Sequence, residues 1–386
     1  MKFKALFALL VTVAANAAAA PSVQALIAVE PTARKATWSI SVASLESGLG
    51  KASTGSVGVI TSEDLADVMR STRSSQYTVF IGPPQVGASA LQRGYELVGA
   101  TQPSEPFVLV ASKRVEKIDA VRGKRIYLPQ QDSIYSYMAR GLLNRAGYSL
   151  SDLEPKYHRI PQAGLTSIAL GMSDLTVVRQ SDYRDWLNAD SNAAAITHVL
   201  AISEPVPGGF TIVVKKDLDA DSRSKIGAWF AAPPTTAGLP GAKIRPDAVE
   251  YKRIAELGVF TPLTLPGVTR VSAAEAQALV QQRNAVLVDT RIEPEYRQKH
   301  IQGAIWAPYV EKSLKDVNFD VAVDDFSALS RLPVDRPKIF SCNGAECWKS
   351  YKAAKVAVAK GHKQVFWLRG GLPEWVESGL PTTKEE

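Results

Sequence analysis

The stretch Phe340-Ser341-Cys342-Asn343-Gly344-Ala345-Glu346-Cys347-Trp348-Lys349 holds both cysteines of a 386-residue chain, five positions apart. Residues 338–341 before it predict a strand. The residues from about Cys347 to Lys360 predict a helix, with Gly361 placed to cap its end. The cysteines therefore belong to a loop between the carboxyl end of a strand and the start of a helix. That is where α/β sheets place ligands and chemistry.

The loop has the features of an anion cradle. The backbone N–H groups from Asn343 to Cys347 lie at a helix start, where the helix dipole adds positive potential. Both effects favour a thiolate over a thiol at Cys342. Gly344 permits the tight turn that such a cradle needs.

The residues around the loop alternate strands with helices. Ser272 and Glu275 form a capping box that predicts a helix start. Strands are expected at 285–289, 303–307, 338–341 and 365–368, and further helices at 293–299, 324–331 and 347–360. This alternation predicts a parallel-sheet α/β domain with helices on both faces.

Two groups of residues in this half stand in the order of known signatures. The first group is Val288-Asp289-Thr290-Arg291, Glu295-Tyr296 and the run from His300 to Ile305. The second is Cys342 after a strand, then Ser350, Leu368-Arg369-Gly370-Gly371 and Trp375. Together they resemble the rhodanese family over roughly Val268 to Pro381.

The resemblance implies a sulfurtransferase without a cofactor. Its cysteine takes a sulfane sulfur, becomes a persulfide, and passes the sulfur to a thiol or another thiophilic acceptor. By position, Cys342 is the nucleophile, and Asp289 and Arg291 are structural supports near the loop. The amides that would stabilise the persulfide are those of Asn343, Gly344, Ala345, Glu346 and Cys347.

The loop also departs from the pattern of thiosulfate-using rhodaneses, which often carry Arg or Lys within it. Here it contains Glu346 and no basic residue before Lys349, so we expect the carboxylate to repel dianionic thiosulfate. Trp348 stands where a cysteine phosphatase needs an arginine, which argues against phosphate chemistry.

The cysteine pair has several interpretations. A metal site is disfavoured because two cysteines lack the further ligands that zinc requires. A structural disulfide suits an oxidising compartment, although closing so short a ring stabilises little. We favour a nucleophile with a companion thiol, in which Cys347 attacks a persulfide or sulfenic acid on Cys342 and gives a reversible disulfide. An inert binding module is the remaining alternative.

The chain begins with a pattern typical of a secretory signal peptide. Lys2 and Lys4 precede an apolar stretch from Ala5 to Val13, and Ala15-Asn16-Ala17 supplies small residues for cleavage. The apolar part is shorter than the roughly 20 residues of a membrane-spanning helix. We therefore expect residues 1–20 to be removed and the protein to be soluble and periplasmic.

The length and the prolines predict two domains. The chain is longer than one hydrophobic core usually serves. Prolines crowd the span from Ala231 to Pro266, with one helical piece from Asp247 to Leu257 inside it. We expect a front domain over 21–262, ending in a proline-rich linker from about 231, and a second domain over 263–386. The net charge of +7 is spread along the chain, which fits small anionic ligands but not nucleic acid.

The front half repeats the alternation, with strands expected at 25–29, 57–60, 77–81 and 107–110. A helix begins near Ser133 and runs to about Ala146. Its free N–H groups and the hydroxyls of Ser133 and Ser136 form a natural anion site. An ordinary N-cap by Asp132 or Ser133 explains the same residues without a ligand.

Several short segments of the front half follow one another in the order typical of a known protein family. They are Val79 to Pro83, Asp119 to Lys124, the helix start at Ser133, Ile168 to Leu175, Tyr183 and Ser203 to Gly208. They resemble the periplasmic substrate-binding proteins of phosphonate and phosphite ABC transporters. The resemblance implies two α/β lobes around a hinged cleft, one lobe from roughly Val110 to Leu200, and a membrane component of the transporter as a partner. It also implies that a small anionic or sulfur-containing ligand is bound by Gly82, Ser133, Tyr135 and Ser136.

Two functions follow from these patterns. The favoured one is an exported rhodanese-type sulfurtransferase that forms a persulfide on Cys342 and carries a small-anion-binding domain in front. The alternative is a periplasmic solute-binding protein of an ABC-type transporter, for a phosphonate-like ligand or a sulfur oxyanion. Its rhodanese module would then be a redox or docking element. We favour the enzyme because Cys342 stands inside a complete cradle.

Overall fold

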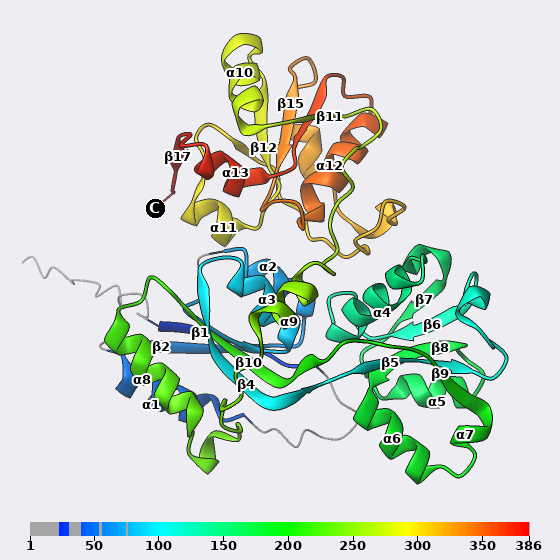
Figure 1. Cartoon of the computed structure of the whole chain (residues 1–386). Helices are drawn as coiled ribbons and strands as arrows, with labels where there is room; N and C mark the ends of the chain where they lie inside the picture. Colours follow the sequence, from blue (N-terminus) through cyan, green and yellow to red (C-terminus); the bar gives the residue numbers. More distant parts are fainter. Residues whose placement is uncertain (1–22, 31–39, 54–55, 75, 386) are drawn as a thin grey trace, which may run out of the picture.

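The computed structural model describes residues 23–30, 40–53, 56–74 and 76–385. The expected signal peptide, residues 1–20, lies outside these ranges. Within them the chain forms three five-stranded sheets, two in the front half and one in the back half (Figure 1). None of the helices in the described ranges is both long enough and apolar enough to span a bilayer.

The first lobe is built on a mixed sheet of order β2-β1-β3-β10-β4. β1 is parallel to β2 and β3, whereas β10 is antiparallel to β3 and β4. The strands are β1 Val23–Ala28, β2 Val57–Ser62, β3 Val79–Gly82, β4 Tyr95–Glu105 and β10 Val206–Lys215. The helices are α1 Val42–Ala52, α2 Leu65–Ser71, α3 Pro84–Leu91, α8 Ala220–Ala231 and α9 Ala248–Ala255.

Both faces of this sheet are covered, because alternate residues of each strand point to opposite sides. Ile27 and Val79 pack with α1 and α8 on one face. Leu26 and Phe80 pack with α2, α3 and α9 on the other. The inner strands β1 and β3 are therefore almost entirely apolar and buried, as their sequence runs suggested.

The second lobe has the sheet order β7-β6-β8-β5-β9. β6 is parallel to β7 and β8, and β5 is antiparallel to β8 and β9. Its strands are β5 Phe107–Ser112, β6 Arg125–Leu128, β7 Glu154–Tyr157, β8 Leu175–Arg179 and β9 Thr197–Ile202. Its helices are α4 Ile134–Arg145, α5 Ala163–Ala169, α6 Gln180–Ala189 and α7 Ala193–Ile196.

Two extended connections join the lobes. β4 continues into β5 through Pro106 alone, and β9 is followed by β10 after residues 203–205. The two connections are linked, since the N–H of Phe107 donates to the Ser203 hydroxyl over 2.8 Å. The two-lobed α/β architecture expected from the sequence is thus confirmed.

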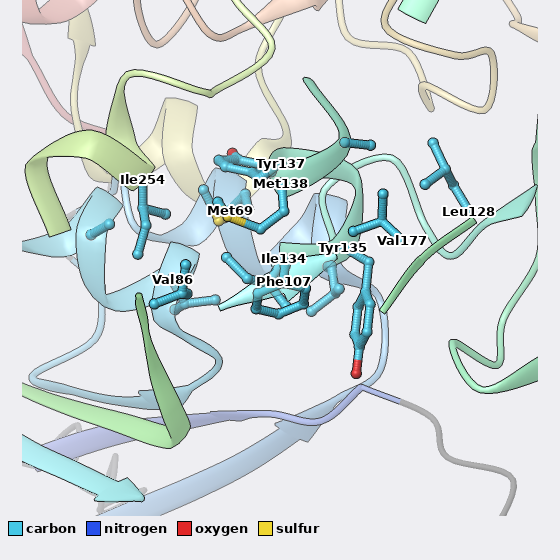
Figure 2. Packing of buried hydrophobic residues seen from close by; sticks show 14 of the residues in the cluster. Met69, Val86, Phe107, Leu128, Ile134, Tyr135, Tyr137, Met138, Val177 and Ile254 are labelled. Atoms are coloured by element: carbon cyan, nitrogen blue, oxygen red, sulfur yellow. The ribbon is translucent and has the colours of Figure 1, made fainter. Parts of the chain in front are cut away.

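The two lobes contact each other closely. One apolar cluster joins Met69 and Val86 of the first lobe to Ile134 and Val177 of the second (Figure 2). Polar contacts accompany it. Glu30 Oε1 accepts the N–H of Ile134 at 3.1 Å.

The back half has a sheet of order β11-β16-β15-β12-β14, in which every strand pair is parallel. Its strands are β11 Thr269–Val271, β12 Val286–Asp289, β14 Ile305–Trp306, β15 Lys338–Ser341 and β16 Val365–Leu368. Its helices are α10 Ala273–Arg283, α11 Glu293–Gln298, α12 Trp348–Ala359 and α13 Gly371–Glu377. A separate pair, β13 His300–Ile301 and β17 Thr382–Thr383, is antiparallel.

The parallel sheet of the back half confirms the predicted fold class, with one local error. The helix predicted over 324–331 is only a short 3-10 turn, Ser327–Arg331.

The proline-rich span belongs largely to the front half. Tyr251 and Ile254 of α9 are part of the front core, whereas Val259 and Leu265 pack against the back core. The chain therefore passes from one core to the other between these residues. The domain boundary near Pro262 stays a prediction.

Glu30 gives the lobe contact a dependence on pH. Burial raises the pKa of the Glu30 carboxyl to about 7, from a model-peptide value of 4.5. Since the folded state holds the proton more tightly, the stability present below about pH 4.5 is lost as the pH rises through about 7.

We predict that Glu30→Gln raises the melting temperature at about pH 8, where the buried charge is removed and the acceptor for Ile134 N–H is kept. The gain should shrink toward about pH 5, in thermal melts monitored by circular dichroism. Glu116→Gln, at an exposed position, is the matched control. An equal change at both pH values would contradict this account of the carboxyl.

Candidate functional site

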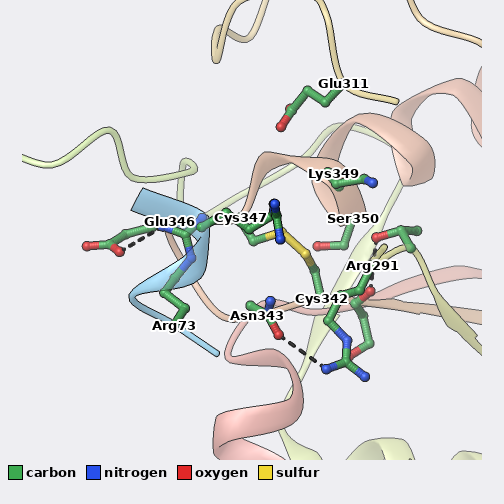
Figure 3. Close-up of a disulfide and its surroundings, with 12 residues drawn as sticks. Arg73, Arg291, Glu311, Cys342, Asn343, Glu346, Cys347, Lys349 and Ser350 are labelled. Atoms are coloured by element: carbon green, nitrogen blue, oxygen red, sulfur yellow. Dashed lines mark hydrogen bonds and ion pairs between the residues drawn. A yellow bond between two sulfur atoms is a disulfide. The ribbon is translucent and has the colours of Figure 1, made fainter. Parts of the chain in front are cut away.

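Cys342 directly follows β15, the central strand of the back sheet. Its side chain and that of Cys347 are buried, and the two form a disulfide with a Cα–Cα separation of 6.2 Å (Figure 3). Cys347 is the residue that precedes α12, so the disulfide lies between the strand end and the helix start. This is the strand–loop–helix placement that the sequence predicted.

The loop between the cysteines presents unused amides. Gly344 has φ of +95°, the left-handed region that favours glycine. The N–H of Cys347 donates to Gly344 O over 3.0 Å. The N–H groups of Asn343, Gly344, Ala345 and Glu346 donate no hydrogen bond to the part of the chain that the structure describes. Four of the five predicted amides therefore have no acceptor among the described residues, and their role in stabilising an anion stays a prediction.

Neighbouring segments fix the loop in place. The N–H of Leu372 donates to Cys342 O over 2.8 Å, and the Thr261 hydroxyl donates to Ala345 O over 2.8 Å. Gly371 has φ of +61°, and a Cβ there would lie 2.1 Å from Cys342 O and 2.7 Å from Gly344 N. Only glycine fits at this position without displacing the loop.

A buried network holds the side chain of Asn343. Its Nδ2 donates to Glu295 Oε1 over 3.0 Å, and its Oδ1 accepts from Arg291 Nη1 at 3.4 Å. Arg291 is in turn paired with Asp289 at 2.6 Å. The predicted supports, Asp289 and Arg291, thus reach the loop through Asn343 (Figure 3). Their catalytic importance stays a prediction.

The carboxylate of Glu346 is already paired. Its Oε2 accepts from Arg73 Nη1 at 3.3 Å and from Arg93 Nη2 at 2.8 Å, and both arginines come from the first lobe. Glu346 is therefore not the unpaired charge that the loop sequence alone suggests, and its repulsion of thiosulfate stays a prediction. Two guanidinium groups therefore meet one carboxylate at the tip of the loop.

Lys349 does not supply the positive charge that the loop lacks. Its ammonium donates to the backbone carbonyl of Tyr309 and lies 4.9 Å from the centre of the Tyr309 ring. Burial lowers the pKa of Lys349 to about 8. In Figure 3 it lies on the side of the disulfide opposite Arg73.

The helix start proposed as an anion site in the front half is occupied by protein groups. The Ser133 hydroxyl accepts the N–H of Ser136 at 3.2 Å, and the Ser136 hydroxyl donates to Gln130 O over 2.9 Å. The carboxylate of Glu30 takes the N–H of Ile134. The N-cap interpretation of Ser133 therefore describes this state, with Glu30 in the position of the anion.

The other two proposed ligand residues, Gly82 and Tyr135, lie in different surroundings. Gly82 is buried, and a Cβ there would lie 2.9 Å from the Cβ of Ala28, so this glycine serves packing. Tyr135 packs edge-to-face on Phe107, and its hydroxyl points away from the apolar cluster (Figure 2). Burial raises the pKa of Tyr135, the nearby Arg179 guanidinium lowers it, and the Glu30 carboxylate raises it.

Two polar groups at the lobe contact were not singled out from the sequence. Gln85 is fully buried, and its Nε2 donates to Asp132 O over 3.0 Å. Gln85 Oε1 and Arg179 Nη1 are buried and have no hydrogen-bond partner among the residues that the structure places. Arg179 Nη1 also lies 3.7 Å from Glu105. Together with Glu30 and Tyr135, these groups form a polar cluster between the lobes.

The last feature to consider is metal binding by clustered side chains. Within the described ranges, no group of three or more His, Cys, Asp and Glu side chains could hold a metal ion.

Comparison with known families assigns both halves. Residues 26–239, more than half of the chain, match the family described as ABC transporter, phosphonate, periplasmic substrate-binding protein. The chain belongs to this family. Residues 272–378 match the rhodanese-like domain family, so the protein is a substrate-binding domain followed by a rhodanese-like domain.

Individual relatives match one domain or the other. Rhodanese-like domain-containing protein 14 of Arabidopsis thaliana is 29% identical over 30% of this chain, and the match spans 64% of the plant protein, less than two thirds of its length. Thiosulfate sulfurtransferase GlpE of Glaesserella parasuis is 28% identical over 29% of this chain and 91% of its own. The solved structure of PhnD1 from Prochlorococcus marinus with methylphosphonate is 14% identical, with a TM-score of 0.46, over 61% of this chain and 97% of its own.

The sequence signatures located the rhodanese loop, but they missed the residues that the substrate-binding domain contributes to it. Arg73 and Arg93 stand 273 and 253 positions before Glu346. No local pattern marks such a pairing. The only sequence signal was the absence of a cation in the loop itself, which is consistent with a cation supplied from elsewhere in the fold.

We predict that Gly371→Ala displaces the loop at Cys342. Gly379→Ala is the matched control, since Gly379 has a similar φ of +68° but no atom within 4 Å of an added Cβ. The control should lose about 1 kcal/mol of stability from backbone strain alone. Gly371→Ala should lose at least about twice that amount, because strain at crowded sites reaches about 3 kcal/mol. Urea unfolding of the two proteins measures the difference. Equal losses would show that Gly371 does not constrain the loop.

Proposed function

We propose that this protein is an exported rhodanese-type sulfurtransferase that carries a sulfane sulfur as a persulfide on Cys342. One observation carries the proposal: Cys342 lies at the carboxyl end of the central strand, next to four loop amides that have no other partner. Such amides at a helix start stabilise an anion, whether it is the thiolate or the persulfide.

The reaction needs Cys342 as a thiolate, so the disulfide is first reduced by a dithiol, which is oxidised to its own disulfide. The Cys342 sulfur then attacks the sulfane sulfur of the donor. A new S–S bond forms on Cys342, the S–S bond of the donor breaks, and the leaving group departs with the electron pair.

In the second half of the cycle, an acceptor thiolate attacks the outer sulfur of the persulfide. The S–S bond to Cys342 breaks, the acceptor becomes a persulfide, and Cys342 returns as a thiolate. In a side reaction, Cys347 attacks the inner sulfur, releases hydrosulfide and re-forms the disulfide. The disulfide is then a resting state that protects the nucleophile.

The substrate-binding domain is proposed to bind a small anion between its lobes. Arg179 supplies a cation there, and Glu30 is the carboxylate that such a ligand would displace from the N–H of Ile134. Family membership supports export to the periplasm, by the signal peptide expected at 1–20, and a transporter membrane component as partner.

We predict that Cys342→Ser abolishes sulfur transfer to cyanide in the dithiol-reduced protein, because the persulfide can no longer form. In the parent, mass spectrometry should detect one added sulfur atom on the peptide that contains Cys342. Cys347→Ser is the control and should keep the first transfer while losing the disulfide. Parent-like turnover by folded Cys342→Ser would overturn the assignment of the persulfide to Cys342, and a reduced parent that transfers no sulfur would instead be a solute receptor with an inert or redox module.

We predict that a small oxyanion binds between the two lobes and thereby raises the melting temperature of the full-length Cys342→Ser protein. A ligand at a hundredfold its dissociation constant stabilises by about 2.7 kcal/mol. A thermal-shift panel of methylphosphonate, phosphate, methanesulfonate and sulfite tests this. Arg179→Gln should abolish the shift, whereas Arg122→Gln, an exposed pair partner of Asp152, should not. A shift that survives Arg179→Gln would place the anion elsewhere.

A further inference from the structure

At the tip of the Cys342–Cys347 loop, Glu346 is buried against the substrate-binding domain. There it forms an ion cluster with Arg73 and Arg93. The side chains of Glu346 and Arg73 are 9% and 6% exposed, and that of Arg93 is 27% exposed. One carboxylate oxygen receives both guanidinium groups. Burial lowers the pKa of Arg93, Glu346 opposes this shift, and repulsion by Arg73 adds to it. The cluster holds one more positive charge than negative.

A pocket of about 500 Å³ opens at this cluster. Its wall includes Arg73 and Arg93 from one domain and residues 343–346, which carry the unused amides, from the other. The pocket therefore combines both domains at the tip of the loop that begins at Cys342, while Cys342 itself is buried and is not part of the wall.

The described cations of this wall all come from the substrate-binding domain: Arg73, Arg93 and Lys215. Lys215 pairs with Asp217 at 3.1 Å, so the arginines are the cations that face the loop. The rhodanese-like domain adds carboxylates at Glu374 and Glu377 to the wall, and Glu374 Oε1 accepts the N–H of Ala273 at 2.9 Å. Two cations of its own near the loop, Arg291 and Lys349, are bound to Asp289 and to Tyr309 and do not line the pocket.

We propose that this pocket is a composite sulfur-donor site, and that Arg73 and Arg93 bind the oxyanion end of a thiosulfate or thiosulfonate. This inference rests on the proposed sulfurtransferase function and names its donor class. Planar guanidinium groups match oxyanions, and Glu346 holds them in place until the donor displaces its carboxylate. The donor's sulfane sulfur is transferred to Cys342, and the sulfite or sulfinate leaves with the electron pair toward the arginines.

The test uses the full-length, dithiol-reduced protein with cyanide as acceptor, and compares dianionic thiosulfate with monoanionic methanethiosulfonate. Arg73→Gln and Arg93→Gln should each raise the KM for thiosulfate about tenfold, with a smaller rise for methanethiosulfonate and a smaller change in kcat. Arg93→Lys should recover part of the loss because it keeps the charge. Glu346→Gln should lower the KM for thiosulfate, since it removes the competing carboxylate.

Arg122→Gln, which removes an exposed charge in the second lobe, is the matched control and should leave the KM unchanged. Circular dichroism establishes that each variant is folded. Folded Arg73→Gln and Arg93→Gln proteins whose KM for thiosulfate stays within about twofold of the parent would overturn the composite site.

A binding measurement separates this proposal from the sulfurtransferase function. Thiosulfate is titrated calorimetrically into Cys342→Ser, alone and combined with each arginine variant. If an arginine change abolishes thiosulfate binding, the composite anion site is supported. If the parent in addition never gains sulfur on Cys342, the proposed sulfurtransferase function is rejected while the anion site stands. Binding that survives both arginine changes belongs to the lobe cleft and rejects the composite site.

Discussion

The pairing of Glu346 with Arg73 and Arg93 is the contact on which the arrangement of the two domains around the thiol depends. Burying a carboxylate or a guanidinium group alone is costly, and the cost falls only when both are present with good geometry. Each domain therefore supplies a group that the other needs for burial. The same contact closes the catalytic loop to solvent on the side of the substrate-binding domain and leaves a pocket there.

Helix α2 extends this dependence to the second lobe. At its first residue, the N–H of Leu65 donates to Gln130 Oε1 of the second lobe over 2.9 Å. Near its end, Arg70 Nη1 lies 3.3 Å from Glu295, the residue that holds Asn343. Lys315 of the rhodanese-like domain also pairs with Asp132 at 2.6 Å, beside the start of α4. The rhodanese-like domain thus rests on both lobes (Figure 1).

Much of this fold could be predicted from local sequence patterns. Short continuous apolar runs and turn residues identified β12, β15 and β16, and the strand–loop–helix around Cys342 followed from a few residues on either side. The contacts of the residues between the two lobes were harder to predict. Ser133 was recognised as a helix start, but the N–H beyond it is taken by Glu30, 104 positions earlier. Which acceptor fills a helix N-terminus depends on the packing of the lobes, and no pattern near Ser133 encodes that packing.

The charge around the Cys342–Cys347 loop also could not be predicted from nearby residues. Read alone, Glu346 is a lone negative charge beside a nucleophile. In the fold it is the centre of a positive cluster, because the nearest cations belong to loops that follow α2 and α3. A carboxylate that has no cation beside it in the loop sequence is paired in the fold by two arginines from another domain.

The shared ion cluster also constrains how this gene can change. A rhodanese-like domain exchanged by recombination would bring a loop without a partner for Arg73 and Arg93, and would leave two buried cations facing each other. Loss of either arginine would in turn leave Glu346 with fewer charges to offset its burial. These three positions, far apart in the chain, should therefore covary among homologues that keep both domains, and the fusion should be inherited as one unit.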